Sequence, residues 1–597
     1  MGSAVKTFQG IGVRRNRRRH NRLPGGCLVW LFLFQLAAGE SRAGRMTIHF
    51  RTRIQEKNTE GFSAWKIVET EKTVQTDKTA IIVCDMWEEK GCRAHVERIA
   101  VMAPLVHALI VDARRRGIRI ILAPSDITDY YNNTPARKRI QAVPFYPVPK
   151  DQPHADPPLP VETAGNTCDS ESNFGQVERQ HPAIRIDQEK DVISSDGQEI
   201  WNFLQHEKIK HVFILGVHTN MCILTRPFAI QQMVKWGVDI ALVRDATDAS
   251  VNPFLRPYVS HEAGTELVVS YIEKFWCPSV SLEEIADVRS IPFAPWKTKT
   301  AADRRIRDPI AQSVGPIYKK ADQKLLFEGT IQQKAFDAKK LYVWETVQVP
   351  VAFLANRTAL IIQDMWDRTE NAETMRRVDA LAPRLHAFVQ AVRQKGVTVI
   401  HAPGGAVQPY EDTPARQRIQ PLRREDMPSL EFVDSRYRYL AWLPRNPHDS
   451  ERRDPDLADP PPPIRASVPR PDAGTADRGP RRQHPSIGIN PESDCISDDH
   501  QEIWNLFRWR KIENVLLAGF LTGETVLSSP AGVKQMAGWG IHTVVLKDLT
   551  VTDCDPDQPP YVNYEEGKNI LDGYLEKFWC LTALGGDILA SRKNQSF

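Results

Sequence analysis

Long stretches of the second half of the chain repeat the first half. Thr79–Trp87 (TAIIVCDMW) recurs as Thr358–Trp366 (TALIIQDMW) at an offset of 279 residues. Gln198–Asn202 (QEIWN) recurs as Gln501–Asn505 at an offset of 303, so the second copy carries 24 additional residues. We place them in the Arg/Pro-rich region 424–458. A repeat of this length indicates a duplicated domain and not a solenoid.

The duplication predicts the domain plan. We expect a first copy over 40–300, a linker over 301–340 and a second copy over 341–597. The 597 residues also exceed what one hydrophobic core normally organises, so at least two domains are expected.

Strands and helices alternate within each copy. Strands are predicted at the apolar runs Ala80–Val83, Ile118–Ala123, Val212–Val217 and Ile240–Val243, with a shorter strand at Ala183–Ile186. Helices are predicted around Ile99–Ile110, Gln198–Glu207 and Cys222–Trp236. Continuous apolar strands separated by helices predict a three-layer α/β/α domain with a mostly parallel, Rossmann-like sheet.

Reactive residues gather at the predicted carboxyl ends of the strands, where such sheets bind ligands. Asp85, Ser125, Cys222 and Asp245 all fall there. Cys222 also begins a predicted helix, whose dipole would lower the pKa of the thiol and favour the nucleophilic thiolate. The competing interpretation is an ordinary core cysteine, because free cysteine is among the most buried residue types.

A cysteine nucleophile needs a base, a cation and donors for the developing oxyanion. We assign Asp85 as base and Lys190 as cation, with the backbone N–H groups of His218 and Cys222 as oxyanion hole. Asp85 could instead be a helix cap or a core-edge carboxylate, and Lys190 a solvated loop residue. Substrate binding is assigned to Trp87, Thr219 and Asn220. Trp87 could equally be an ordinary packing residue.

The first copy resembles the isochorismatase-like cysteine hydrolases, which include nicotinamidases, N-carbamoylsarcosine amidohydrolase and isochorismatases. The residues that carry the resemblance are Ile81–Met86 (IIVCDM), a strand followed by Asp, and Gly216–Cys222 (GVHTNMC), matching Gly-x-x-Thr-x-x-Cys. It spans roughly 75–280, and more faintly 355–583.

The resemblance implies a mechanism in which Asp accepts a proton, Lys stabilises charge and Cys attacks a carbonyl or related carbon. Asp85 and Cys222 match directly, whereas Lys190 matches only in a gap-free register from Ile200. The family also places a cis peptide at the position of Val217–His218. The implied substrate is a small amide, ureido or related compound.

No catalytic metal or other cofactor is expected. A nicotinamidase-type metal site needs an Asp and histidines after the second strand, and Ser125–Tyr130 contains no histidine. Nicotinamide is therefore a less favoured substrate.

The second copy departs from this pattern. Asp364 remains, but Thr525 stands where the first copy has Cys222, and Ser493 stands where it has Lys190. We predict an inactive, structural second domain that forms an intrachain pseudo-dimer with the first, with further homo-oligomerisation open. A chain of two degenerate domains that only binds a small molecule or a protein is the alternative.

The N-terminus is typical of an export signal. Residues 1–39 carry seven basic and no acidic side chains, then the apolar core Cys27–Leu36 and the small residues Ala37–Gly39. An uncleaved membrane anchor is the alternative. Without this segment the net charge falls from +4 to −3, which gives no electrostatic case for nucleic acid. Of the remaining cysteines, Cys92 and Cys168 are the first candidates for a disulfide.

Overall fold

A computed structural model describes most of the chain beyond its N-terminal segment. The described residues are 44–88, 91–170, 179–286, 323–369, 372–428, 462–464, 481–520 and 529–590, with the backbone of 304–305. The predicted signal 1–39, half of the predicted linker, nearly all of the predicted insertion, and Thr525 lie outside them.

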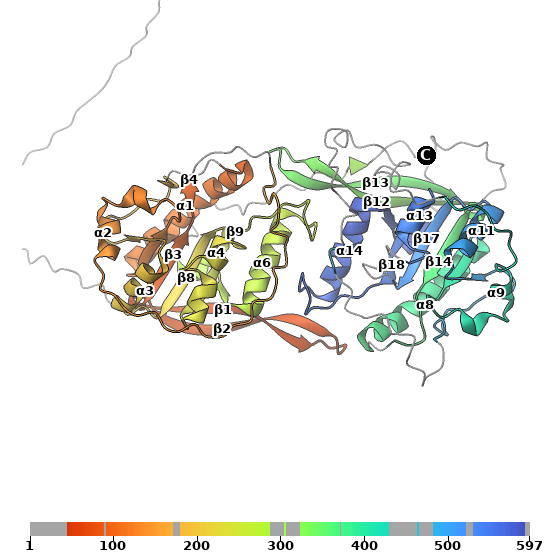
Figure 1. The fold of residues 1–597 in the computed structure, drawn as a ribbon, viewed down its shortest axis with the longest axis horizontal. Coiled ribbons are helices and arrows are strands. Elements are labelled where there is room, and N and C mark those ends of the chain that lie inside the picture. The colour runs from red at the N-terminus through yellow and green to blue at the C-terminus, as the bar shows by residue number, and fades with distance from the viewer. Residues whose placement is uncertain are drawn as a thin grey trace, which may run out of the picture. The chain divides into compact units, whose positions relative to one another are not determined.

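The first half forms an eight-stranded sheet in the order β2-β1-β10-β9-β8-β3-β5-β7 (Figure 1). Its strands are β1 (Arg45–Lys57), β2 (Ser63–Gln75), β3 (Thr79–Cys84), β5 (Arg119–Ala123), β7 (Val192–Ile193), β8 (His211–Val217), β9 (Asp239–Asp248) and β10 (Ser279–Val280). All neighbours from β10 to β7 are parallel, whereas β1 pairs antiparallel with both of its neighbours, β2 and β10.

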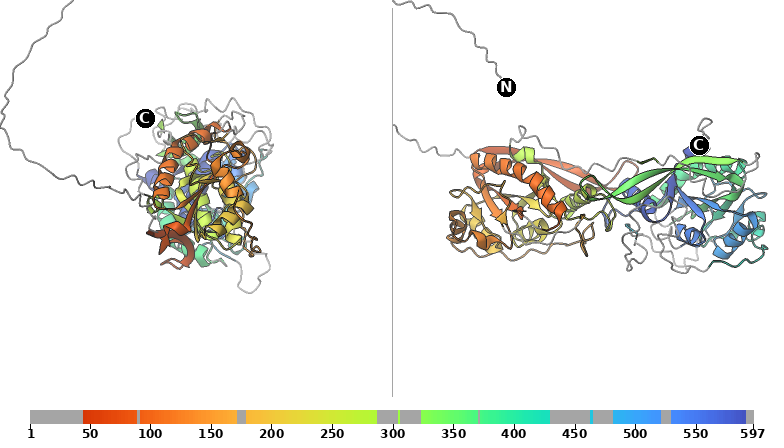
Figure 2. Two further views of the ribbon diagram at one scale, coloured as in Figure 1. Left: turned by 90° about the vertical axis from the view of Figure 1, so that its left-hand side faces the viewer. Right: turned by 90° about the horizontal axis from the view of Figure 1, so that it is seen from above.

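Helices cover both faces of this sheet (Figure 2). They are α1 (Arg93–Arg115), α2 (Pro135–Gln141), α3 (Gly197–His206), α4 (Cys222–Thr225), α5 (Ile230–Lys235), α6 (His261–Phe275) and α7 (Leu282–Ile285). Alternate residues of β3 enter opposite cores: Ile81 packs in the cluster that contains α1, and Ile82 in the cluster that contains α3, α5 and α6. Burial on both faces explains why the parallel strands read as continuous apolar runs.

The second half forms a nine-stranded sheet in the order β11-β13-β12-β19-β18-β17-β14-β15-β16. Its strands are β11 (Arg304–Arg305), β12 (Lys324–Phe336), β13 (Tyr342–Leu354), β14 (Thr358–Gln363), β15 (Thr398–Ala402), β16 (Cys495–Ile496), β17 (Asn514–Phe520), β18 (His542–Val551) and β19 (Leu581–Ala583). Its helices are α8 (Ala372–Gln394), α9 (Pro414–Gln417), α11 (His500–Arg510), α13 (Val533–Gly538), α14 (Tyr564–Phe578) and α15 (Gly585–Leu589). Apart from β11, the order matches that of the first sheet, and the predicted α/β class is confirmed.

The antiparallel hairpins were not predicted, and they exchange equivalent hydrogen bonds between the halves. The indole Nε1 of Trp65, in β2, donates to the Pro556 carbonyl across 2.8 Å. The indole of Trp344, in β13, donates to the Pro253 carbonyl, also across 2.8 Å. These pairs sit at the repeat offsets of 279 and 303 residues.

Three local predictions were wrong. The helix expected over Cys222–Trp236 is broken into α4 and α5, because the proline after Arg226 cannot continue the first turn. Ala183–Ile186 forms a turn and irregular structure instead of a strand. Asp245 lies within β9 and caps α7, accepting from the Leu282 N–H at 2.8 Å, because β9 continues to Asp248.

Among the described residues one helix, α1, has the length and apolar composition of a membrane-spanning segment. Its apolar side packs in the core: Ile99, Val106 and Leu109 are at most 1% exposed. Core burial therefore accounts for its composition.

Candidate functional site

Asp85 is the first residue after β3, and its carboxylate is fully buried. Oδ1 accepts the backbone N–H of Ser125 at 2.7 Å, because the parallel neighbour β5 ends at the same edge of the sheet. Burial raises the pKa of this carboxyl group, although hydrogen bonds from Cys222 and Ser125 and the charge of Arg226 oppose the rise. Asp85 is therefore a better proton acceptor than an exposed aspartate.

Cys222 lies beside this carboxylate. It follows the loop after β8, begins α4, and its thiol hydrogen-bonds Asp85 while remaining only 8% exposed. The pKa of the thiol is raised to about 12 by burial and by the negative charge of Asp85. The expected lowering by a helix dipole was wrong, because α4 is a single turn of four residues and burial outweighs it.

The turn before Cys222 requires Gly216 and contains the predicted cis peptide. Gly216 has φ +115°, and an added Cβ would lie 2.0 Å from the Cys84 carbonyl oxygen. The cis peptide at Val217–His218 is confirmed. The backbone N–H of His218 is directed at the Cys222 sulfur and slightly favours the thiolate. Among the described residues, no backbone oxygen accepts the N–H of Cys222. A donor to an oxyanion has to be free in this way.

The cation at this site is Arg226, which the sequence reasoning missed. Its Nε donates to Oδ2 of Asp85 at 3.3 Å, and its Nη2 donates to Oδ2 of Asp126 at 2.7 Å. The side chain is 28% exposed, so it joins the buried carboxylate to the surface. The available signal was its place one helical turn after Cys222, immediately before Pro227.

Lys190 is placed elsewhere. It is exposed, at the end of a turn in which its backbone N–H bonds Asp187. Within the described part of the chain, no contact joins its ammonium group to Asp85 or Cys222. Its catalytic role stays a prediction that these contacts do not support.

The three residues assigned to substrate binding differ in position. Trp87 is half-buried in β4 (Trp87–Glu88), and its Nε1 donates to the Ser125 carbonyl at 3.2 Å, next to Asp85. Thr219 and Asn220 are fully buried and fix the loop: Thr219 Oγ1 lies 2.7 Å from Thr247 Oγ1, and Asn220 exchanges two hydrogen bonds with Ser250. Their proposed contact with substrate stays a prediction.

A buried ionisable network adjoins the same loop and was also missed. The rings of His95 and His218 are 4.3 Å apart, and His261 Nε2 lies 2.8 Å from Oδ1 of Asp248. Burial and neighbouring cations lower the pKa of His95 to about 2, and burial above all lowers that of His218 to about 4. For His261, burial and Arg98 disfavour protonation, but the negative charges of Asp248 and Asp169 outweigh them and raise its pKa.

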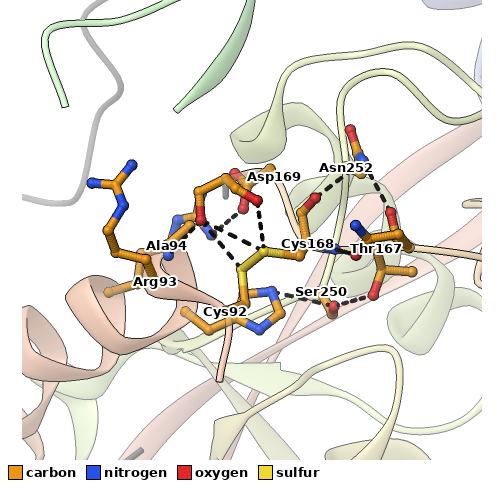
Figure 3. Close-up of a disulfide and its surroundings, with 12 residues drawn as sticks. Cys92, Arg93, Ala94, Thr167, Cys168, Asp169, Ser250 and Asn252 are labelled. Atoms are coloured by element: carbon orange, nitrogen blue, oxygen red, sulfur yellow. Dashed lines mark hydrogen bonds and ion pairs between the residues drawn. A yellow bond between two sulfur atoms is a disulfide. The ribbon is translucent and has the colours of Figure 1, made fainter. Parts of the chain in front are cut away.

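The disulfide predicted between Cys92 and Cys168 is confirmed (Figure 3). It ties the N-cap of α1 to the segment that follows α2. The other described cysteines, Cys84, Cys222, Cys277, Cys495, Cys554 and Cys580, are free and buried.

The corresponding region of the second half is built differently. Asp364 keeps its place and accepts the Gly404 N–H at 2.8 Å. At the offset of Cys84 stands Gln363, whose amide donates to Ser529, the residue at the offset of Arg226. The cation of the first site is thus replaced by a neutral hydroxyl.

No protein-family model matches the chain, and no curated protein matches it. Many solved structures are similar to part of it, among them the following three. A cysteine hydrolase from Pseudomonas syringae pv. phaseolicola 1448A shares 14% identity over 40% of this chain and 92% of that chain, with a TM-score of 0.23. An isochorismatase family protein from Burkholderia thailandensis shares 12% identity over 40% of this chain and 97% of that chain, with a TM-score of 0.23. Another isochorismatase family protein, from Desulfovibrio vulgaris subsp. vulgaris str. Hildenborough, shares 14% identity over 36% of this chain and 98% of that chain, with a TM-score of 0.23. The strand order, and not these similarities, defines the α/β fold.

Proposed function

We propose that the chain is a cysteine hydrolase of the isochorismatase-like type that cleaves a carbon–nitrogen bond in a small amide or ureido compound. The observation that carries this proposal is the hydrogen bond between the Cys222 thiol and the buried Asp85 carboxylate, which also binds Arg226. The nucleophile and the cation lie on either end of α4, and they meet the base, which follows β3, at the carboxyl edge of the sheet, where such folds bind ligands.

The proton movements follow from the two pKa values. Because the thiol is protonated at rest, attack transfers its proton to Asp85 as the sulfur–carbon bond forms. Asp85 then gives this proton to the leaving nitrogen as the carbon–nitrogen bond breaks, which leaves on Cys222 a thioester from an amide or a thiocarbamate from a ureido compound. Water attacks the thioester carbon while Asp85 takes one proton from the water. As the sulfur–carbon bond breaks, Asp85 passes this proton to the sulfur of Cys222, which restores the thiol and releases a carboxylic or carbamic acid.

The oxyanion formed at each attack needs hydrogen-bond donors. The N–H groups of His218 and Cys222 flank the sulfur within one tight loop, which suits them for this role. Arg226 favours the ionised form of Asp85 before the attack, and its exposed face is available to a polar group of the substrate. We therefore assign to Arg226 the charge-stabilising role that the resemblance gives to a lysine.

The second half is proposed to be structural. It keeps Asp364 but has Ser529 at the offset of Arg226, and the sequence places Thr525 at the offset of Cys222. The exchanged Trp65 and Trp344 hydrogen bonds support an intrachain pseudo-dimer of the two halves. Export, followed by cleavage of the N-terminal segment, remains part of the proposal.

Hydrolysis of a panel of small amides and ureido compounds tests this function. Cys222→Ala and Asp85→Asn should each abolish turnover, while Asp364→Asn, the matched change in the second half, should leave it intact. The burial and raised pKa of Cys222 favour one competing function, a non-enzymatic binding protein. Saturable binding of a panel member without turnover, and unaltered by Cys222→Ala, would support that alternative.

A further inference from the structure

Four side chains with metal-binding groups gather where α1 begins (Figure 3). Cys92 is the N-cap of α1 and His95 lies in its first turn, whereas Cys168 and Asp169 come from the segment after α2. The ligand atoms of Cys92, His95 and Asp169 all lie within 4.8 Å of one another, and the Cys168 sulfur is bonded to that of Cys92. All four residues are buried, with at most 8% exposed.

We propose that this cluster, once its disulfide is reduced, binds one divalent cation of the zinc class. The ligands are the sulfurs of Cys92 and Cys168, a ring nitrogen of His95 and one carboxylate oxygen of Asp169. A dithiol reductant breaks the sulfur–sulfur bond, is itself oxidised to a disulfide, and leaves two thiols. The cation then displaces both thiol protons. In the oxidised form both sulfurs are consumed by the disulfide, and the cluster has no thiolate to offer.

The donor set suits this class of cation. Zinc in proteins takes four nitrogen, sulfur or oxygen ligands in a tetrahedron, with bonds of about 2.0–2.3 Å and hence about 3.3–3.8 Å between ligand atoms. The ligand atoms of Cys92, His95 and Asp169, which lie within 4.8 Å of one another, need only a small contraction around the ion, whereas the Cys168 sulfur has to move away from that of Cys92 once the disulfide is reduced. Two thiolates and a carboxylate bring three negative charges and the cation neutralises two of them. The remaining charge faces Arg98, whose Nη1 lies 3.1 Å from Oδ1 of Asp169.

The surrounding residues fix the ligands in the way metal sites require. His95 Nε2 lies 3.3 Å from the Ser250 hydroxyl, a contact that orients the imidazole ring. Asp169 is held by Arg98 and by His261, whose Nδ1 lies 3.4 Å from Oδ2. Thr374 stands at the offset of His95 in the second half and donates to Asp553, so the His95 ligand is particular to the first half.

Cobalt(II), a spectroscopic substitute for zinc, tests the proposal on the full-length chain. The protein is reduced with a dithiol, freed of reductant without oxygen, and titrated with cobalt(II). We expect one equivalent to bind, with sulfur-to-cobalt charge-transfer absorption and the d–d bands of a tetrahedral site. The oxidised protein should show neither. His95→Gln and Asp169→Asn should weaken binding at least tenfold, consistent with the loss of a ligand. Cys580→Ser, at a buried free cysteine of the second half, should change nothing.

Two results would overturn the proposal. One is reduced wild-type protein, still folded by circular dichroism, that gives no thiolate–cobalt absorption. The other is absorption that persists unchanged in His95→Gln, which would place the cation at other cysteines. The comparison of reduced with oxidised wild type needs no variant, so misfolding of a substituted protein cannot obscure it. Because the readout is spectroscopic, it is independent of hydrolase activity.

Discussion

Arg226 donates its Nε hydrogen to Oδ2 of Asp85 across 3.3 Å, although the two residues are 141 positions apart in the chain. Burial raises the pKa of the carboxyl group, and this guanidinium, together with the hydrogen bonds from Cys222 and Ser125, opposes the rise. Arg226 also reaches the surface, where its Nη2 bonds Asp126 at 2.7 Å. The pair therefore links the buried base to the side from which a polar substrate would approach.

Removing the charge of Arg226 should impair the proposed reaction at low pH most. In Arg226→Gln the pKa of Asp85 rises further, because a cation at this distance favours the ionised form. On the acidic side of the pH profile kcat/KM should then fall about tenfold, since fewer molecules carry the ionised carboxylate. Arg119→Gln, which removes an arginine paired with Glu207 at the surface, is the matched control. An unchanged profile in Arg226→Gln would contradict the assigned role.

The wild-type pH profile should carry the signature of Asp85. Activity requires the ionised carboxylate, so kcat/KM should rise with pH, with a midpoint above the ordinary aspartate pKa of 3.8. Burial is the cause of the upward displacement, and the hydrogen bonds from Cys222 and Ser125 limit it. A midpoint at or below the ordinary value would show that Asp85 is not the base. The midpoint is obtained from initial rates between acidic and neutral pH.

The ion pair between His261 and Asp248 should make stability depend on pH. The pKa of His261 is raised, so its contribution is fully present below its ordinary value of 6.5 and is lost as pH rises through the folded value. Breaking a buried pair of this kind costs about 3–5 kcal/mol. Chemical denaturation should show a larger loss for His261→Gln at pH 6 than at pH 9, while the exposed His206→Gln should lose little at either pH. Equal losses at both pH values would argue against a charged His261.

Loss of the disulfide should destabilise the first half. Cys92 and Cys168 are 76 positions apart, and removing a native disulfide costs about 2–5 kcal/mol. The double variant Cys92→Ala, Cys168→Ala should melt at a lower temperature than wild type in a differential scanning fluorimetry experiment. Reductant should lower the melting temperature of wild type but not of the double variant. A melting temperature insensitive to both changes would mean that this link adds no stability.

Sequence patterns predicted the α/β fold because they reflect burial directly. Runs such as Ala80–Val83 and Val212–Val217 are apolar on both faces, as only a covered parallel strand requires. The first hairpin escaped prediction because the alternation of buried and exposed residues in β1 is short. It covers Met46, Ile48 and Phe50 and then fades along the strand. Local periodicity is weak where a strand leaves the core.

The site was only partly predictable for a related reason. Asp85 follows β3 and Cys222 follows the loop after β8. Because β3 and β8 are parallel neighbours, their carboxyl ends bring the two residues together. The position of the Arg226 side chain depends on where the chain turns after α4, and that of Lys190 depends on how its loop folds. Sequence periodicity reveals neither position. The raised pKa of the Cys222 thiol could not be predicted from the sequence either, since it reflects burial by residues distant in sequence.

The most direct test of the central claim is acid-quench mass spectrometry of the full-length protein mixed with hydrolysable members of the amide panel. The account predicts an acyl group on the peptide that contains Cys222, absent in Cys222→Ala and in Asp85→Asn, and turnover that stops in both variants. Because the free thiol has a pKa of about 12, alkylation without substrate reports on burial and not on catalysis. Turnover that continues undiminished in Cys222→Ala, or no turnover of any panel member, would contradict the assignment of Cys222 as nucleophile.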